Sequence, residues 1–529
     1  MRATPRSIVV TAVVFTSAVL VGVGQSAAAA PTRTAAVARV AGVATATART
    51  VNAAAASSIA DPAPARGTPA SALRGAPSLP SRPTGTARKP VPAAPGRAGG
   101  PNTVSNPQVV PLVAPAVLAN FDGINQASGC GGCQPPDPNA AISPSQIVQA
   151  VNLRFQVTTN TGGLLCSFNL NSFLGTSDSL SDPRVEYDNV NARFIFVLTV
   201  VPASTSAAPA LWLGATTSSN ACGSWFIYRP TFSGGSYPAG TLLDYPILGQ
   251  DRNAMLLGTA NFTPSSGVNF TVFGVQKSAI YTGAGFSFSA FNTASLCAPV
   301  SNGGIPMIST ALSYFLGSVP GTGYRLYNLT NSGGPGAVLT LQATISSAFT
   351  APTRRVNQPG TTATLDPLDG RIDWSPVNDG NFIWFAHGID LSGFPAVRYG
   401  AISIAGNTAT VAVAFRSGTS DDFNPSVGVG NSPTGGDYIY LNWAYTDTPN
   451  GIATSDTVDS VAPGAGVPNL IGTGAVLVNG SSTTEFRFGD FSSVAIDPTN
   501  PNGSCALTAQ QYFAPNGTWN TRLARVGIC

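Results

Sequence analysis

The chain is poor in charged and reactive side chains. Only 9% of its 529 residues are Asp, Glu, Lys or Arg, and it contains a single histidine, His387. Soluble domains usually carry about 25% charged residues, and long charged helices or coiled coils need more Glu and Lys than this chain has. A single imidazole also excludes a His-rich zinc site and a two-His, one-carboxylate iron site. The side chains that remain offer few means of catalysis.

The amino terminus has the pattern of an export signal. Arg2 and Arg6 precede an uncharged apolar run from residue 8 to residue 23, and small residues follow up to Ala30. This order is typical of a cleaved secretory signal peptide. The run is also shorter than the roughly 20 residues that a membrane-spanning helix needs. We therefore predict a signal peptide over residues 1–30 and a secreted mature chain, free or attached to the cell envelope, with no integral membrane span.

Basic residues are concentrated near the amino terminus. Residues 1–110 carry a formal charge of +10 and residues 111–529 carry −7. The segment 31–110 is rich in Ala, Pro, Thr and Arg, and it cannot bury enough apolar surface to offset the entropy of ordering it. We predict a disordered linker, which is either a solvated spacer or a tether to an anionic surface. The acidic body has no cluster of basic residues, so nucleic-acid binding is not expected.

All seven cysteines follow residue 120, and in an oxidising compartment they are expected to be structural. Cys130 and Cys133 form a C-x-x-C in a loop rich in Gly and Pro, with no helical pattern behind it. This context favours a local disulfide over a redox motif. Cys505 and Cys529 are expected to close the last hairpin. Because seven is odd, at least one thiol has no partner within the chain.

From residue 111 onward, short apolar runs alternate with turns rich in Gly, Pro, Asn and Asp, and no window shows a helical period. This pattern predicts strands, and the domain over 111–529 is therefore all-β. The runs predicted as strands are 193–200, 211–215, 225–229, 270–275, 381–386 and 437–444.

A short phrase recurs along this domain: a small or acidic residue, often a proline, two or three apolar positions, and an acidic turn. Its clearest copies are 182–188 and 244–251; looser copies begin at residues 369, 424 and 490, and weaker ones at 137 and 304. The starts lie 45 to 66 residues apart, which leaves room for four strands per unit. Such a repeat is typical of a β-propeller, whose innermost strands line a central channel. We count seven blades, or six if the first and last units complete one shared blade.

Several segments resemble a known family. These are 130–139 (CGGCQPPDPN), 181–188, 244–251, the phrase RFGDFSSVAIDP from residue 487, and the final 519–525. Over roughly 120–529 the chain resembles secreted bacterial sialidase-like, Asp-box-related β-propellers, most of which have no assigned activity. The resemblance implies an extracellular propeller with six or seven blades.

The resemblance also suggests where to look for catalysis. Sialidases bind a substrate carboxylate with three arginines, whose forked guanidiniums match it, and use a Tyr–Glu nucleophile with an Asp acid/base. Only Glu186 and Glu485 are available as the glutamate, and the nearest thing to an Asp-box, 218–225, lacks its Asp. Glu186 shares a strand face with Arg184, two residues earlier. These departures weaken the prediction of catalysis. The candidate arginines are Arg184, Arg371 and Arg487.

The repeated acids divide into two sets. Asp182 and Asp188 lie six residues apart on one strand, about 20 Å, and so belong to opposite mouths of the channel. The acids that begin their strands form the candidate binding site: Asp137, Asp182, Asp244 and Asp490. Alternatively, each bonds neighbouring backbone N–H groups and keeps the blades in register. At the other mouth, Asp188, Asp251 and Asp497 are followed by turn sequences, which predicts that they cap turns.

Two further groups have weaker claims to a function. Asp366, Asp369 and Asp373 form an acidic cluster that could bind calcium through hard oxygen ligands, although their order does not match an EF-hand loop. His387 is the one possible base for a Ser–His–Asp hydrolase, but no G-x-S-x-G elbow accompanies it. An ordinary packed histidine is the better interpretation.

The sequence as a whole favours a secreted, non-catalytic, monomeric β-propeller that binds an extracellular glycan or protein through one channel mouth. No cofactor is expected, with calcium the one metal to consider. A sialidase-like glycoside hydrolase and a purely structural envelope protein are the alternatives.

Overall fold

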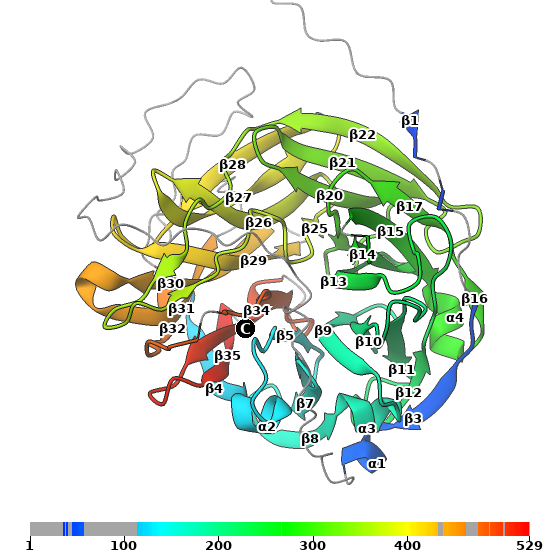
Figure 1. The fold of residues 1–529 in the computed structure, drawn as a ribbon, viewed down its shortest axis with the longest axis horizontal. Helices are drawn as coiled ribbons and strands as arrows, with labels where there is room; N and C mark the ends of the chain where they lie inside the picture. Colours follow the sequence, from blue (N-terminus) through cyan, green and yellow to red (C-terminus); the bar gives the residue numbers. More distant parts are fainter. Residues whose placement is uncertain are drawn as a thin grey trace, which may run out of the picture. The chain divides into compact units, whose positions relative to one another are not determined.

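The computed structural model describes residues 35–37, 39–40, 45–57, 114–265, 267–431, 437–461, 474–485, 487–500 and 503–527. These residues form a seven-bladed β-propeller, in which each blade is a sheet of at least four strands beside a central channel (Figure 1). The all-β prediction and the count of seven blades are confirmed, and the count of six is wrong. The predicted signal peptide lies outside the described residues. Within them, no helix is both long enough and apolar enough to span a membrane.

Each blade runs from an inner strand at the channel to an outer strand at the rim. From the inner to the outer strand, the first blade contains β5 (Asn139–Ile142), β6 (Ile147–Val151), β7 (Arg154–Thr158) and β8 (Leu164–Asn169), and the second contains β9 (Ser179–Asp188), β10 (Arg193–Val201), β11 (Leu211–Thr216) and β12 (Ser224–Tyr228). The third contains β13 (Leu242–Gln250), β14 (Ala254–Phe262), β15 (Val268–Gln276) and β17 (Ala290–Thr293), and the fourth contains β18 (Ala298–Pro299), β20 (Ser313–Val319), β21 (Gly323–Thr330) and β22 (Val338–Ser346). The fifth blade contains β25 (Val377–Asn378), β26 (Phe382–Leu391), β27 (Phe394–Ser403) and β28 (Thr408–Ala414), and the sixth contains β29 (Asp421–Asn431), β30 (Asp437–Asp447), β31 (Ile452–Val461) and β32 (Ala475–Val478). The seventh contains β33 (Ser493–Ile496), β34 (Cys505–Phe513), β35 (Trp519–Gly527) and β4 (Val117–Asn125). The six runs predicted as strands are β10, β11, β12, β15, β26 and β30, so all six are confirmed.

Short elements occupy the connections between these strands. β19 (Ser301–Asn302) lies parallel to β25, and β23 (Val356–Asn357) pairs with β24 (Thr364–Leu365). The short helices are α2 (Gln126–Cys130), α3 (Leu170–Leu174), α4 (Lys277–Thr282) and the 3₁₀ helix η2 (Thr448–Asn450).

The two ends of the domain close the ring. β4 pairs antiparallel with β35, placing Phe121 opposite Leu523, so the seventh blade takes its outer strand from the start of the domain. The sequence offered a blade shared between the first and last repeat units, and this alternative is wrong. The first unit forms a complete blade of its own, from β5 to β8, and the strand that β4 adds to the seventh blade precedes that unit, so the total is seven.

Backbone geometry explains the recurring phrase. Asp137, Asp182, Tyr245 and Asn424 have positive φ angles between 51° and 57°, and each directly precedes a proline. The pairing of β9, β13 and β29 shifts register at these sites, as in a β-bulge. Proline suits a bulge because it has no N–H to donate, and Asp and Asn tolerate the left-handed region better than most residues. The phrase thus encodes a bulge at the start of an inner strand.

Two of the looser copies are not inner strands. Residues 304–308 form turns after β19, and residues 369–373 lie in the connection before β25. The inner strands of the fourth and fifth blades are instead the two-residue elements β18 and β25, which are too short to show a pattern in the sequence.

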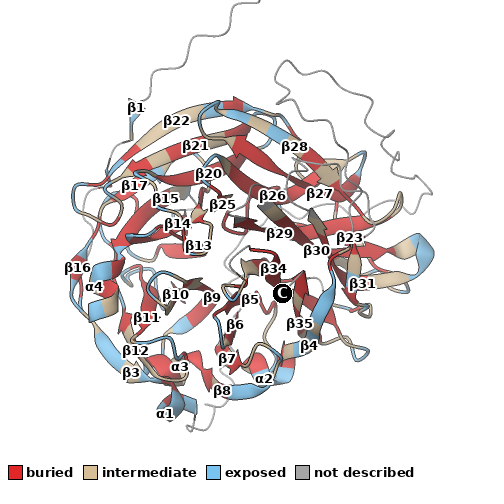
Figure 2. Ribbon diagram, turned by 180° about the vertical axis from the view of Figure 1, so that it is seen from behind, coloured by how far each residue is buried: buried red, intermediate tan, exposed pale blue. Residues whose placement is uncertain are grey.

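Stacked blades make the core. Phe155, Phe196 and Trp225, from the first two blades, form one aromatic cluster with ring centroids 5.6–6.3 Å apart. Figure 2 shows that burial decreases from the channel to the rim: inner strands are buried, whereas outer strands such as β4 and β28 have exposed positions. Glycine permits the closest contacts, because a Cβ at Gly258 would lie 2.1 Å from the carbonyl oxygen of Cys297. The high glycine content therefore has a packing reason as well as a role in turns.

The described residues among 35–57, here called the rim segment, lie along the outer edges of three consecutive blades. β1 (Ala35–Ala36) pairs with β22, β2 (Thr45–Ala46) with β16 (Phe286–Ser287), and β3 (Arg49–Asn52) with β12. α1 (Ala53–Ser57) then buries two alanines in the core of the first two blades. The sequence predicts disorder for 31–110, but these described residues form edge strands and a helical turn. Residues 58–110 lie outside the described residues.

Two disulfides join described cysteines. Cys130–Cys133 is present, which confirms the local bridge, and Cys166–Cys222 links the first two blades. Cys505 is disulfide-bonded, and Cys529, its expected partner, lies outside the described residues. Cys297 is a buried free thiol between the third and fourth blades.

Candidate functional site

The inner strands begin at one end of the channel, here called the amino-terminal mouth, where acids tie neighbouring blades together. Oδ2 of Asp182 accepts a hydrogen bond from the backbone N–H of Tyr245 at 3.2 Å, and Oδ1 of Asp137 accepts one from Asp490 N–H at 2.8 Å. Asn152 links the two acids, because its Nδ2 donates to Asp137 and its Oδ1 accepts from Asp182 N–H. These contacts have the geometry of the registering role that the sequence offered beside a binding role.

An aromatic pair and a buried arginine lie among these acids. The ring centroids of Tyr245 and Phe491 are 4.8 Å apart, and both residues are fully buried. The guanidinium carbon of Arg184 lies 3.2 Å from the centroid of the Phe491 ring, and its Nη2 donates to the carbonyl oxygen of Asp373 at 2.6 Å. The cation–π contact and the hydrogen bond together hold this arginine inside the channel.

The other two candidate arginines reach the same aromatic pair from inter-blade connections. The guanidinium carbon of Arg371 lies 4.4 Å from the Tyr245 ring centroid, and Arg371 pairs with Asp369 at 2.5 Å. Arg487 pairs with Asp490 at 2.7 Å, and the carbonyl oxygen of Asp490 accepts from the Tyr245 hydroxyl at 3.2 Å. The structure thus brings Arg184, Arg371 and Arg487 to one mouth.

Burial changes the protonation of this cluster. Burial and the charges of Asp490 and Asp182 raise the pKa of Asp137 to about 8. Burial likewise raises the pKa of Asp373 to about 8, against the opposing charge of Arg184. Burial lowers the pKa of Arg184 to about 10, which still leaves it charged at neutral pH. The mouth therefore offers protonated carboxyls and guanidiniums as donors, together with carboxylates as acceptors.

Some buried polar atoms of the mouth are not matched within the described part of the chain. Nε and Nη1 of Arg184 and Oδ1 of Asp373 make no hydrogen bond there. A buried donor or acceptor left unsatisfied costs about 1–3 kcal/mol, and such atoms normally meet water or a ligand. They mark a position where a polar ligand atom would be stabilised.

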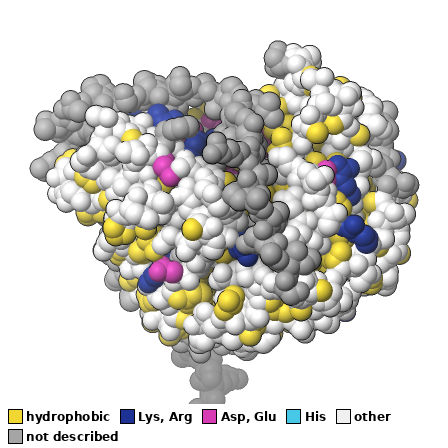
Figure 3. Space-filling view, turned by 60° about the horizontal axis from the view of Figure 1, so that its bottom comes forward, with side chains coloured by type: hydrophobic (Ala, Val, Ile, Leu, Met, Phe, Trp, Pro, Cys, Tyr) yellow, Lys and Arg dark blue, Asp and Glu magenta, His cyan; other side chains and the backbone are white. Residues whose placement is uncertain are grey.

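The accessible members of the mouth lie on the connections. The side chains of Arg371, Asp369 and Arg487 are 26%, 58% and 11% exposed, whereas Arg184 and Asp373 are buried. Figure 3 shows that charged side chains on the face in view are few and scattered.

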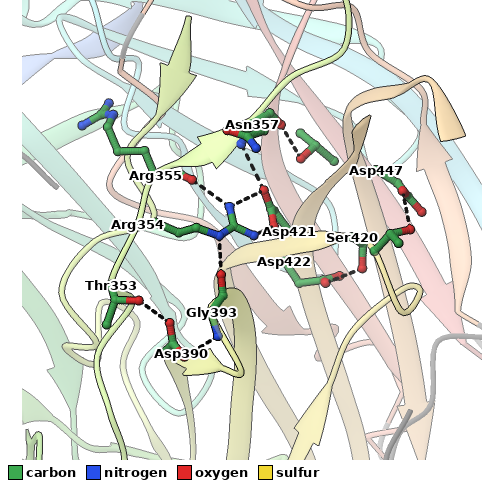
Figure 4. A network of polar contacts seen from close by, with 12 residues as sticks. Thr353, Arg354, Arg355, Asn357, Asp390, Gly393, Ser420, Asp421, Asp422 and Asp447 are labelled. Carbon is green, nitrogen blue, oxygen red and sulfur yellow. Dashed lines mark hydrogen bonds and ion pairs between the residues drawn. The ribbon is translucent and has the colours of Figure 1, made fainter. Parts of the chain in front are cut away.

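A buried ion pair fixes the connection 347–376, which carries Arg371, Asp373 and Trp374. Arg354 forms a two-pronged contact with Asp421 at the start of β29, with nitrogen–oxygen distances of 2.5 and 2.9 Å (Figure 4). Asp421 also accepts from the backbone N–H of Asn357 at 3.0 Å. The connection is therefore anchored to the sixth blade by a pair that is almost wholly buried.

The remaining candidates are placed elsewhere or serve structural contacts. Glu186 lies further down the channel on Ser301, and Asp244 is fully buried directly before Tyr245. Asp366 lies 3.8 Å from Arg355, so it does not join Asp369 and Asp373 in one site. In the described ranges, no group of three His, Cys, Asp or Glu side chains could hold a metal ion.

His387 is a packed core residue. It is fully buried, its Nε2 lies 2.9 Å from the Tyr324 hydroxyl, and its Nδ1 lies 3.0 Å from the carbonyl oxygen of Gly388. Burial lowers its pKa to about 3, so the ring is neutral at physiological pH.

The acids of the second set cap turns at the opposite mouth. Oδ1 of Asp188 accepts from Val190 N–H and Asn191 N–H, and Oδ1 of Asp251 accepts from Asn253 N–H and Ala254 N–H. Asp497 does the same for Thr499 N–H. These contacts have the form predicted from the turn sequences.

Sequence reasoning missed the aromatic members of the amino-terminal mouth. Tyr245, Trp374 and Phe491 each directly follow an aspartate: Asp244, Asp373 and Asp490. This recurring Asp–aromatic dipeptide was a signal in the sequence that would have found them. Its meaning becomes visible only when the ring closes and brings the three dipeptides together.

Comparison with known proteins finds only a distant structural likeness, which carries no argument about fold or function. No family model and no curated protein matches the sequence. The exo-β-1,3-galactanase of Phanerochaete chrysosporium is 9% identical over 79% of this chain and 99% of its own, with a TM-score of 0.29. The subtype N10 neuraminidase-like protein of A/little yellow-shouldered bat/Guatemala/060/2010 is 10% identical over 66% of this chain and 99% of its own, with a TM-score of 0.33. A mutant of Trypanosoma rangeli sialidase displaying trans-sialidase activity is 9% identical over 65% of this chain and 53% of its own, with a TM-score of 0.30. This distant likeness to sialidase-like and galactanase propellers carries no argument about substrate.

Proposed function

We propose that this protein is a secreted β-propeller that binds an extracellular glycan at the amino-terminal mouth. The observation that carries the proposal is the convergence of three arginines and several acids on the Tyr245–Phe491 pair. Sugar hydroxyls both donate and accept, so a mixed cluster suits them better than it suits a purely anionic or cationic ligand.

A glycan fits this mouth better than a protein partner does. Its key groups, Arg184 and Asp373, are almost fully buried and lie beneath the partly exposed Arg371 and Asp369. The accessible part of this cluster is small enough to match a single sugar unit, whereas protein interfaces need a much broader surface. Secretion enters the proposal from the amino-terminal signal pattern.

Glycoside hydrolysis is the second candidate. The raised pKa of Asp373, about 8, would let this side chain hold a proton at neutral pH, as a general acid must. Hydrolysis also needs a second carboxylate at a defined separation from the acid. Binding without turnover requires fewer assumptions and is the function we put first.

The test is a glycan panel presented to the purified full-length chain, followed by calorimetry on any ligand found. Arg371→Met should weaken binding at least tenfold, because it removes an accessible donor but keeps the bulk of the side chain. Arg229→Met is the matched control, since Arg229 directly follows the outer strand β12 and pairs with Asp178 rather than with any residue of the candidate site. Equal binding by both variants would refute the proposal.

The same panel separates the alternatives. Release of reducing sugar that Asp373→Asn abolishes would establish hydrolysis and overturn the binding-only function. Absence of any ligand in the panel would favour a structural envelope protein.

A further inference from the structure

The other half of the channel contains a cavity that borders the amino-terminal mouth at Trp374. Its volume is about 110 Å³, and it is bounded by residues from the inner strands of several blades and from the connection after β19. Most of its wall is apolar, including Ile142, Met307, Trp374, Val429 and Ile496. A space of this size can hold a small molecule or several waters.

One carboxylate faces this cavity. Glu186 is 9% exposed and lines the cavity wall. The Ser301 hydroxyl lies 2.9 Å from its Oε1 and 3.1 Å from its Oε2, and the side chains of Gln250 and Ser375 also hydrogen-bond to this carboxylate. Among the described residues, no basic side chain lies within ion-pair distance of Glu186. The charge of Lys277 acts on this carboxylate from beyond ion-pair distance, so a cation bound directly to Glu186 would further reduce the cost of burying it.

The nearest cation is committed elsewhere. Nζ of Lys277, itself 2% exposed, lies 2.7 Å from Oδ2 of Asp188 and 2.7 Å from Oε1 of Gln250. Lys277 therefore neutralises Asp188. Other charged groups near this end of the channel include Asp251, whose carboxylate accepts from the Ser313 and Ser332 hydroxyls, and Asp497, which pairs with Arg525 at 2.6 Å. Arg184 lies two residues before Glu186 on β9. Arg184 is held on Phe491 and the carbonyl oxygen of Asp373.

We propose that this cavity binds a small organic ammonium ion, with its charged head on Glu186 and its carbon atoms against the apolar wall. The indole of Trp374 adds an aromatic surface of the kind that attracts organic cations. A metal ion is disfavoured because one carboxylate is too few hard ligands. A sugar would leave most of its hydroxyls against aliphatic side chains.

The test uses n-propylammonium chloride as the probe, titrated calorimetrically into the full-length chain at pH 7. Propan-1-ol and propionate are probes of similar size without the positive charge. The expected result is saturable binding of propylammonium, at least tenfold tighter than that of either control. Because burial raises the pKa of Glu186 to about 7, binding should also release roughly half a proton, seen as a dependence of the heat on buffer ionisation enthalpy.

Two variants decide whether Glu186 is responsible. Glu186→Gln should lower propylammonium affinity at least tenfold and remove the buffer dependence. Glu485→Gln is the matched control, because burial also raises the pKa of this other glutamate to about 7, while Gln126 and Gln134 are its hydrogen-bond neighbours. If Glu186→Gln fails to fold, Trp374→Leu replaces it, with a several-fold loss for propylammonium and none for propan-1-ol. Equal binding of all three probes, or unchanged binding by the variants, would overturn the proposal.

Discussion

Replacing Arg354 with alanine should destabilise the protein far more than replacing an arginine whose ion pair is partly exposed, such as Arg371. Arg354 and Asp421 are 7% and 4% exposed, and the two side chains make a two-pronged contact. In Arg354→Ala, Asp421 would keep only the Asn357 N–H as a donor among these contacts. Breaking a buried ion pair by removing one partner costs about 3–5 kcal/mol, because an uncompensated charge is left buried. The guanidinium also stacks on Phe394, at 4.8 Å from the ring centroid, and that contact is lost too.

Arg371→Ala is the control within the same connection. The Arg371–Asp369 pair is equally short, at 2.5 Å, but its side chains are 26% and 58% exposed. Exposed pairs contribute about 0–1 kcal/mol, so the two substitutions should differ by several kcal/mol in the free energy of unfolding.

The assay is urea denaturation followed by tryptophan fluorescence, with the midpoint and the slope compared among the parent and both variants. A double-mutant cycle with Asp421→Asn should show strong coupling, because removing both charges restores balance. A loss in Arg354→Ala no larger than in Arg371→Ala would refute the reasoning that burial decides the strength of these pairs. It would also contradict the conclusion that Arg354 anchors the connection carrying Arg371 and Trp374.

Three further predictions concern other parts of the fold. Arg49→Ala should speed amide exchange in β3 about 5- to 30-fold without changing global stability. The substitution removes the contact with Trp212 and a hydrogen bond to the carbonyl oxygen of Leu174, which together contribute about 1–2 kcal/mol. An unchanged exchange rate in β3 would contradict this prediction. Removing the Cys166–Cys222 bridge, whose ends lie 56 residues apart, should cost about 4 kcal/mol in the chain-entropy model, and a urea midpoint unchanged from the parent would contradict it. Asp456 is fully buried and its folded-state pKa is raised to about 8, so its favourable contribution is present at low pH and is lost as pH rises through 8. Asp456→Asn should therefore flatten the fall in melting temperature between pH 5 and pH 8.5, and parallel profiles would contradict it.

Much of the fold could be predicted because a propeller repeats its local chemistry. The bulge at each inner-strand start needs a residue that tolerates positive φ followed by a proline, and Asp182-Pro183 and Asn424-Pro425 show this directly in the sequence. The fourth and fifth blades were harder to place, since their inner strands have two residues each and leave no periodic pattern. The rim segment was missed for a related reason. Edge strands such as Arg49–Asn52 gain their stability from pairing with another blade, so composition alone suggests disorder.

The candidate site shows the same division. Asp137, Asp182 and the three arginines were identified from residue type and position, but their pairing was beyond the sequence. Whether Arg487 meets Asp490 follows from local spacing, whereas Arg184 meets Phe491 only because the ring closes over a separation of some 300 residues.

By itself, then, the sequence determined the strand content and the scarcity of catalytic groups, because these depend on local patterns and on composition. The choice between six and seven blades was left to the tertiary structure. The tertiary structure alone decided which charges are buried together, since burial depends on neighbours that are remote in the chain. That difference separates Glu186, which faces an apolar cavity, from Asp188, two residues later, which is paired with Lys277. Two carboxylates on one strand thus acquire different chemistry from the blades that surround them.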